Sequence, residues 1–355
     1  MPQEATSIEQ QERLQSLQDQ ITAIPSIETE ESISLKASLL LDLGKAQVEA
    51  EEFEEAAKSF QESLSLYTTE STEKAETHIE LSIAYLGLSQ LEEAEQEINA
   101  AIQIYLLRQD KTDLNKANRQ LALVYAQQGR GEDADKLILQ CIESTKATED
   151  WKEVGRFYGF AGELASMQQD YQTAFEHFRN GLKALKLTGG NHERMGNYYE
   201  SLARLLMHFQ KTEEAANTFE EGAAQFELAN KPILQGGLLT LAAKVWEGRG
   251  KYLQAIPYLK QASEAFQQSE DKTAIMQTAD AHYQAGYLYE QEKQWTDAIE
   301  QHQAALPFAQ QTEDEMLIAS IEDSIEQCQE KLAKNPPKSK DGKKGFFGKL
   351  KDMFG

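Results

Sequence analysis

The chain has 355 residues, of which 40% are hydrophobic and 26% are charged, and its formal net charge is −24. These values exclude a chain that is disordered by composition, and a strongly acidic protein repels the phosphates of nucleic acids. The polar start, MPQEATSIEQQERLQ, lacks the apolar core of a secretory signal, and no run approaches the ~18 apolar residues of a membrane-spanning helix. We therefore expect a cytoplasmic protein that does not bind nucleic acid.

The first predicted element in chain order is a helix over residues 7–24. Its apolar side chains form one stripe, made by Leu14, Leu17, Ile21 and Ile24. The helix precedes a repeated array, and arrays of stacked repeats need caps at their ends. We interpret residues 1–30 as an N-terminal capping helix, and dimerisation through the stripe is the alternative.

Residues 31–312 contain seven segments that carry an alanine in the same setting. The alanines are 38 to 43 residues apart: Ala56, Ala94, Ala134, Ala174, Ala215, Ala255 and Ala298. Three residues before the alanine the side chain is mostly bulky, as at Phe53 and Trp295. Twelve residues before it and seven residues after it the side chain is small, as at Gly44 and Ser63. Four residues after it stand Phe60, Ile98, Ile138, Phe178, Phe219, Leu259 and His302.

This spacing has a direct physical meaning. Residues four and seven apart lie on one face of a helix, and small side chains at fixed points let two helices approach closely. Each segment therefore predicts a helical hairpin, which cannot bury its apolar face alone and stacks on its neighbours.

The recurring pattern Leu-Gly-x2-aromatic…Tyr-x2-Ala-x3-Phe-x2-Ala resembles the signature of the tetratricopeptide repeat (TPR) superfamily, most clearly in residues 39–64, 158–182 and 282–306. The ordinary repeat has 34 residues. The longer spacing here resembles the branch found in spindle-orientation adaptors, kinesin light chains and bacterial peptide-sensing regulators. The resemblance implies an all-α fold, a right-handed α-solenoid of about seven hairpins with terminal capping helices, and a binding scaffold.

After the repeats, residues 313–334 predict a C-terminal capping helix that ends before two prolines. Residues 335–345 read as a basic flexible linker and residues 346–355 as a short amphipathic tail. Six lysines and two aspartates give the last 20 residues a charge of +4, so the remainder carries −28. The tail residues that we expect to contact a membrane or a docking partner are Lys343, Lys344, Phe346, Phe347, Lys349, Leu350, Lys351, Met353 and Phe354.

Three interpretations of this tail compete. The apolar side chains span about 120° of a helix and lysines lie outside that arc, which suits an anionic membrane surface. The tail resembles the short amphipathic targeting helices of bacterial division proteins in this respect. The alternatives are a motif that docks in the groove of another protein, and a tail that folds back on its own acidic body. We favour the membrane surface.

The resemblance also implies where a partner binds, because the first helix of each TPR hairpin lines the concave wall of the array. The inward positions map to Lys45, Lys116, Arg119, Arg156, Arg204, Lys244, Tyr283 and Tyr287. An Arg can hold a carboxylate with two parallel hydrogen bonds, so the predicted partner is a protein or peptide with an acidic segment. A solvated face with chance placement is the alternative, as is a core position for the two tyrosines. The asparagines of the chaperone-type carboxylate clamp are missing.

No motif for catalysis or metal binding is present. Cys141 and Cys328 have no CxxC spacing and no histidine near them in the sequence, and the six histidines are scattered. HExxH, GxxxxGK[ST], GxGxxG and GxSxG are all absent. We therefore expect no catalytic residue, no metal and no cofactor. The predicted function is a non-catalytic scaffold or adaptor, peripheral on the inner membrane surface through its tail. The alternative is a soluble regulator or assembly factor whose tail docks on a protein.

Overall fold

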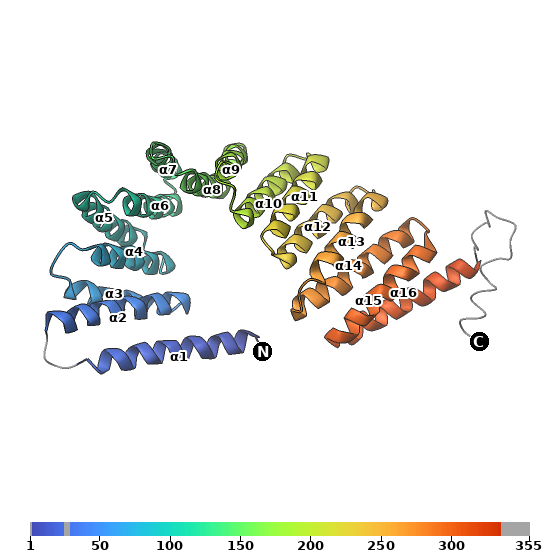
Figure 1. Cartoon of the computed structure of the whole chain (residues 1–355), viewed down its shortest axis with the longest axis horizontal. Coiled ribbons are helices and arrows are strands. Elements are labelled where there is room, and N and C mark those ends of the chain that lie inside the picture. Colours follow the sequence, from blue (N-terminus) through green and yellow to red (C-terminus); the bar gives the residue numbers. More distant parts are fainter. Residues whose placement is uncertain (1, 25–28, 335–355) are drawn as a thin grey trace. The chain divides into compact units, whose positions relative to one another are not determined.

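The computed structural model describes residues 2–24 and 29–334, and every regular element within them is an α-helix. Figure 1 shows the sixteen helices in chain order. The predicted all-α class is confirmed. The first eight helices are α1 (Pro2–Thr22), α2 (Glu30–Glu49), α3 (Phe53–Leu66), α4 (Thr72–Gly87), α5 (Leu91–Arg108), α6 (Lys111–Gln127), α7 (Gly131–Lys146) and α8 (Trp151–Met167). The others are α9 (Tyr171–Lys186), α10 (His192–His208), α11 (Thr212–Leu228), α12 (Pro232–Glu247), α13 (Tyr252–Phe266), α14 (Lys272–Gln291), α15 (Trp295–Thr312) and α16 (Glu315–Lys334).

The repeat pattern is visible in the packing. Helices α2 to α15 form seven hairpins, and the second helix of each begins at the residue three before the repeated alanine, from Phe53 in α3 to Trp295 in α15. All seven repeated alanines have an exposed fraction of 0%. A fully buried methyl group at the contact of two helices leaves no room for a larger side chain. The spacing therefore identified the helix contacts correctly.

Glycine and aromatic residues are matched inside three hairpins. Gly44, Gly162 and Gly286 each lie against the ring that stands four residues after the repeated alanine, namely Phe60, Phe178 and His302. A Cβ atom at Gly162 would lie 2.9 Å from Cδ2 of Phe178, and one at Gly286 would lie 2.5 Å from Cε1 of His302. His302 therefore fills the space that a phenylalanine ring fills in the other two hairpins.

The turn inside each hairpin has the same backbone. One residue in it has a φ of 58° to 77°: Glu51, Ser89, Gly129, Gln169, Gln210, Gly250 and Lys293. The following amide donates a hydrogen bond to the carbonyl five residues earlier, as from Arg130 N to Tyr125 O at 2.8 Å. This left-handed helix ending is the Schellman arrangement, which favours glycine. Only two of the seven turns, at Gly129 and Gly250, have glycine at this position.

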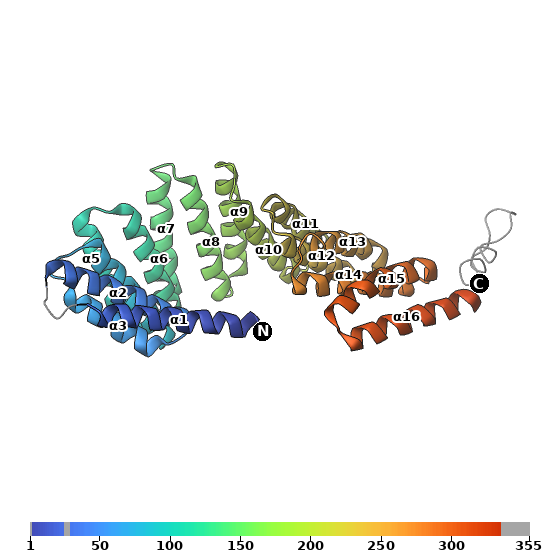
Figure 2. The same cartoon turned by 60° about the horizontal axis from the view of Figure 1, so that its bottom comes forward.

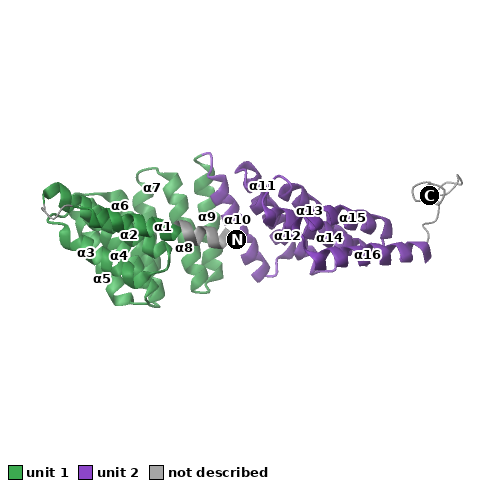
Figure 3. Cartoon of the chain, turned by 90° about the horizontal axis from the view of Figure 1, so that it is seen from below, with its two compact units in different colours: residues 1–188 green, residues 189–355 purple. Residues whose placement is uncertain are grey.

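The chain divides into two compact units, Met1–Thr188 and Gly189–Gly355, drawn in green and purple in Figure 3. Within each unit a helix packs on the helices before and after it. Figure 2 shows α6, α7, α8 and α9 of unit 1 side by side. Each unit has its own buried core, which includes Phe60 and Phe157 in unit 1 and Phe226 and Leu288 in unit 2.

The terminal helices pack on the adjacent hairpins. In unit 1, α1 packs on α2, and Arg13 forms an ion pair with Glu49. In unit 2, α16 packs on α15 and buries Ile321 and Cys328 completely. None of the described helices is long and apolar enough to cross a membrane. The predicted linker and tail, residues 335–355, lie outside the described residues.

Candidate partner-binding surface

The first helices of the hairpins form a continuous row in unit 1. Helix α2 contacts α4, α4 contacts α6, and α6 contacts α8, whereas no two second helices of the described hairpins make comparable contact. Helices on the inner side of a curved stack are closer together than those on the outer side. The first helices are therefore the inner row, as Figure 1 shows for α4, α6 and α8. In unit 2, α12 contacts α14 in the same way.

The α2–α4 end of this row is acidic. Lys45, predicted to bind a partner, forms an ion pair with Glu76 of α4. Burial raises the pKa of the Glu80 carboxyl, the Lys45 ammonium opposes this rise, and the carboxylates of Glu76 and Glu49 add to it. Three carboxylates act on the Lys45 ammonium, those of Glu76, Glu80 and Asp42, so its charge is already compensated within the protein. This end of the row is unsuited to binding an acidic segment.

The next two first helices carry the α6–α8 basic patch, which we define as Lys116, Arg119 and Arg156 with Phe160. The Cζ atom of Arg119 in α6 lies 5.8 Å from the centroid of the Phe160 ring in α8, so the two helices share one surface here. Lys116 bonds Asp113 at 2.6 Å, and Arg156 bonds Glu153 at 2.8 Å, each within its own helix. The exposed fractions of the Lys116 and Arg156 side chains are 56% and 37%.

These ion pairs are weak enough to be exchanged. A solvent-exposed pair between neighbours on one helix contributes about 0–1 kcal/mol. A carboxylate that an Arg guanidinium holds with two parallel hydrogen bonds binds more strongly than a single exposed contact. The patch can therefore accept carboxylates from outside while the helices stay intact.

The predicted residues of unit 2 behave differently from one another. Arg204 in α10 bonds Glu200 at 2.7 Å and has a side chain that is 61% exposed. Lys244 in α12 is exposed and acts on Asp280 of α14, whose carboxyl pKa burial raises and Lys244 partly lowers. Arg204 belongs to unit 2, whereas the α6–α8 basic patch belongs to unit 1.

The two predicted tyrosines of α14 have different surroundings. The Tyr283 ring is 5.3 Å from the ring of His302 and packs against the core between the seventh hairpin and α16. Tyr287 is 49% exposed. The core interpretation therefore applies to Tyr283, and only Tyr287 has the exposure that a binding anchor needs.

The structure also brings together three residues that the sequence analysis did not combine. Glu290, His302 and Cys328 come from α14, α15 and α16. The side chain of Glu290 is only 14% exposed. One signal was available in the sequence, since His302 is a polar residue at a position that is apolar in the other six repeats.

Stacked helical hairpins with an inner row of first helices define an α-solenoid. Comparison with known families gives the same result: residues 41–112 and 240–313 match the tetratricopeptide repeat model. The predicted tetratricopeptide repeats are confirmed in these two stretches. Among curated proteins no sequence matches it.

Solved structures share this fold at low identity. A signal-transduction ATPase with a tetratricopeptide repeat sensor from Pyrococcus horikoshii is 17% identical with a TM-score of 0.54, over 82% of this chain and 45% of that one. The C-terminal part of a TPR repeat-containing protein from Cytophaga hutchinsonii is 12% identical with a TM-score of 0.51, over 79% of this chain and 98% of that one. The apo form of RapI is 13% identical with a TM-score of 0.49, over 84% of this chain and 100% of that one.

Proposed function

We propose that the protein is a non-catalytic scaffold that binds an acidic segment of a partner protein on the inner row of unit 1. The observation that supports this most directly is the α6–α8 basic patch in a chain whose net charge is −24. Most of the surface repels an acidic peptide, so a local group of three cations is where such a peptide is attracted. Lys45 is secondary because Glu76 of the neighbouring helix pairs with it, and Lys244 and Arg204 lie in unit 2, outside this patch.

Binding would replace intramolecular ion pairs with intermolecular ones. Carboxylates of the partner would take the places of Asp113 and Glu153 beside Lys116 and Arg156. The Phe160 ring under Arg119 offers an apolar surface for a hydrophobic side chain of the same segment. An aromatic residue flanked by acidic residues therefore fits the patch better than a uniformly acidic peptide.

The test is fluorescence anisotropy with a labelled peptide that carries one Trp between Asp and Glu residues. Changing Arg119→Glu and Arg156→Glu together should weaken its binding at least about tenfold and flatten its salt dependence. Arg179→Glu is the matched control, because Arg179 is exposed on the second helix α9, outside the patch, and forms an ion pair with Glu176. Equal affinities for the double variant and the wild type would contradict the proposal.

We further propose that the tail tethers this scaffold to an anionic membrane surface. The support is the sequence pattern alone: Phe346, Phe347, Leu350, Met353 and Phe354 share one helical face beside Lys343, Lys344, Lys349 and Lys351. Burying such side chains stabilises the bound state by ~1.5–3 kcal/mol each before ordering is counted, and each lysine adds up to about 1 kcal/mol.

Flotation of the full chain with anionic and neutral vesicles tests the tether. We expect binding to the anionic vesicles alone, weakened by salt, and released by Phe347→Asp with Leu350→Asp. Lys338→Gln, in the linker, serves as the control with a small effect. If the wild type stays unbound, the tether is wrong and the soluble regulator with a protein-docking tail takes its place.

A further inference from the structure

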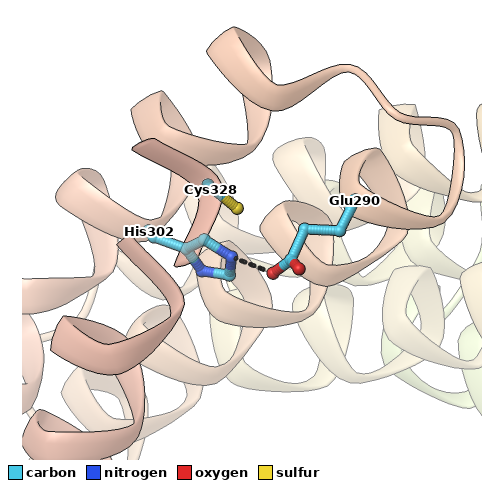
Figure 4. A group of neighbouring side chains, drawn as sticks. All are labelled: Glu290, His302 and Cys328. Atoms are coloured by element: carbon cyan, nitrogen blue, oxygen red, sulfur yellow. Dashed lines mark hydrogen bonds and ion pairs between the residues drawn. The ribbon is translucent and has the colours of Figure 1, made fainter. Parts of the chain in front are cut away.

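The last hairpin and α16 enclose a polar cluster in an otherwise apolar stack. Glu290, His302 and Cys328 offer one oxygen, one nitrogen and one sulfur, and these atoms all lie within 4.8 Å of one another. His302 and Cys328 are completely buried. Figure 4 shows the three side chains converging from three helices. We call this group the Glu–His–Cys cluster.

Packing alone accounts for a ring at this position but not for a histidine. In the hairpins with Gly44 and Gly162, the equivalent ring is phenylalanine. Nδ1 of His302 is buried and has no hydrogen-bond partner among the described residues, which costs free energy that a phenylalanine would not. Placing a carboxylate beside it adds a further desolvation cost. A cation bound beside Glu290 would offset the desolvation cost of the carboxylate.

The charges around the cluster leave a place for a cation. Nε2 of His302 lies 2.9 Å from Oε1 of Glu290, while Nζ of Lys331 lies 3.6 Å from Oε2 of the same carboxylate. Lys331 also lies over the Trp295 ring, with Nζ 4.8 Å from its centroid. The ammonium group is thus held on the Oε2 side, and Oε1, Nε2 and the Cys328 sulfur face one another (Figure 4).

We propose that the Glu–His–Cys cluster binds one divalent zinc-type cation. Thiolate sulfur, imidazole nitrogen and carboxylate oxygen are the ligands that Zn²⁺ takes in proteins, whereas Ca²⁺ and Mg²⁺ prefer six or more oxygens. Tetrahedral bonds of about 2.0–2.3 Å place the ligand atoms about 3.3–3.8 Å apart, so small side-chain rotations suffice here. The fourth position is left for water or an outside ligand.

The proton balance of this binding is simple. Burial, with the Glu290 carboxylate, raises the pKa of the Cys328 thiol to about 11, so the metal-free thiol is protonated. Burial also lowers the pKa of His302, which keeps the imidazole neutral and able to bind a metal. One Zn²⁺ enters and one proton leaves the sulfur, so the cluster gains one net positive charge.

The cation would join α16 to the seventh hairpin. Its three ligands come from α14, α15 and α16, so release of any one helix would open the site. A ligand that binds only the folded state stabilises it by mass action. We expect zinc to raise the melting temperature of the chelator-treated protein by a few degrees, about 3–8 °C.

The experiment uses the tag-free full chain, treated with a chelator and then titrated with Zn²⁺ by calorimetry and with Co²⁺ by absorption spectroscopy. We expect one ion per chain, a thiolate-to-Co²⁺ charge-transfer band, and the thermal shift. His302→Phe is the decisive variant, because Phe60 and Phe178 fill the same space against a glycine. It should keep the helix content and melting behaviour of the chelated wild type, and lose at least about 100-fold in zinc affinity.

Two further variants complete the test. Cys328→Ser should remove the charge-transfer band, and Cys141→Ala should leave zinc binding unchanged because Cys141 lies outside the cluster. Failure of the wild type to bind zinc stoichiometrically would overturn the proposal. Equal zinc affinity of the folded His302→Phe variant would overturn it too, and the cluster would then be a hydrogen-bonded contact only.

Discussion

At the scale of single residues, the glycines of the first helices have two distinct roles. Gly162 faces the Phe178 ring, whereas a Cβ on Gly237 in α12 would have no heavy atom within 4 Å. Both glycines are inside helices, where alanine is intrinsically preferred by about 1 kcal/mol. The two glycines therefore differ in the space available for a Cβ atom, and not in backbone conformation.

This difference predicts opposite effects of one substitution. Gly162→Ala should lower the free energy of unfolding by about 1–3 kcal/mol, since the ring must move, and Gly237→Ala should raise it by up to about 1 kcal/mol. Urea denaturation followed by circular dichroism measures both. A stabilising Gly162→Ala would show that the ring does not fill this space.

A second residue-scale prediction concerns pH. Burial lowers the pKa of His177 in α9, and the carboxylates of Asp135, Asp170 and Glu176 oppose part of this shift. Nδ1 of His177 and Oδ1 of Asp135 are both buried without a hydrogen-bond partner among the described residues. The folded state therefore favours the neutral imidazole, and the unfolded chain binds a proton at a higher pH.

The stability that depends on His177 is complete above its unfolded pKa, near 6.5, and is lost as the pH falls below it. Between pH 7.5 and pH 5.5 the free energy of unfolding should fall more for the wild type than for His177→Gln. The difference between the two proteins should be less than about 1 kcal/mol, because the His177 ring is only partly buried. Melting curves at the two pH values give the comparison. An identical pH dependence of the two proteins would exclude this account.

At the scale of elements, the sequence predicted more of the helices than of the binding surface. The repeated alanine predicted the position of the second helix in each hairpin, because tight helix contacts restrict side-chain size at fixed positions. The ion pairs of Lys116, Arg156 and Arg204 could not be foreseen, since surface rotamers follow no repeat. The Glu–His–Cys cluster was missed because 38 residues separate Glu290 from Cys328 and no spacing rule joins them.

The hairpin turns give an element-scale prediction. A residue other than glycine in the left-handed region is strained by about 1–2 kcal/mol, and Gln169 is such a residue, with a φ of 63°. Gln169→Gly should raise the free energy of unfolding by about 0.5–1 kcal/mol, after the greater chain entropy of glycine is deducted. Gly250→Ala is the reciprocal change. Gly250 has a φ of 68°, and a Cβ atom added there would have no heavy atom within 4 Å, so only backbone strain should lower the free energy of unfolding, by a similar amount. Denaturant titrations in which Gly250→Ala has no effect would contradict the prediction.

At the scale of the whole molecule, each of the two units contains a core of its own. A compact unit with its own hydrophobic core can fold independently. We expect residues 1–188 and residues 189–355, expressed separately, to be helical and to melt cooperatively. Circular dichroism and calorimetry of the two fragments test this, and an unfolded fragment would show that its unit depends on the rest of the chain.

The contact of each helix with its neighbours in sequence also has a kinetic consequence. Chains whose contacts are local fold in microseconds to milliseconds, because little loop entropy is lost before a contact forms. Ribosomes add about 5–20 residues per second, so a repeat of about 40 residues takes roughly 2–8 s to synthesise. Each new hairpin therefore has ample time to pack on the hairpins already made before the next one is synthesised. The pace of translation, rather than conformational search, sets how fast this protein is completed.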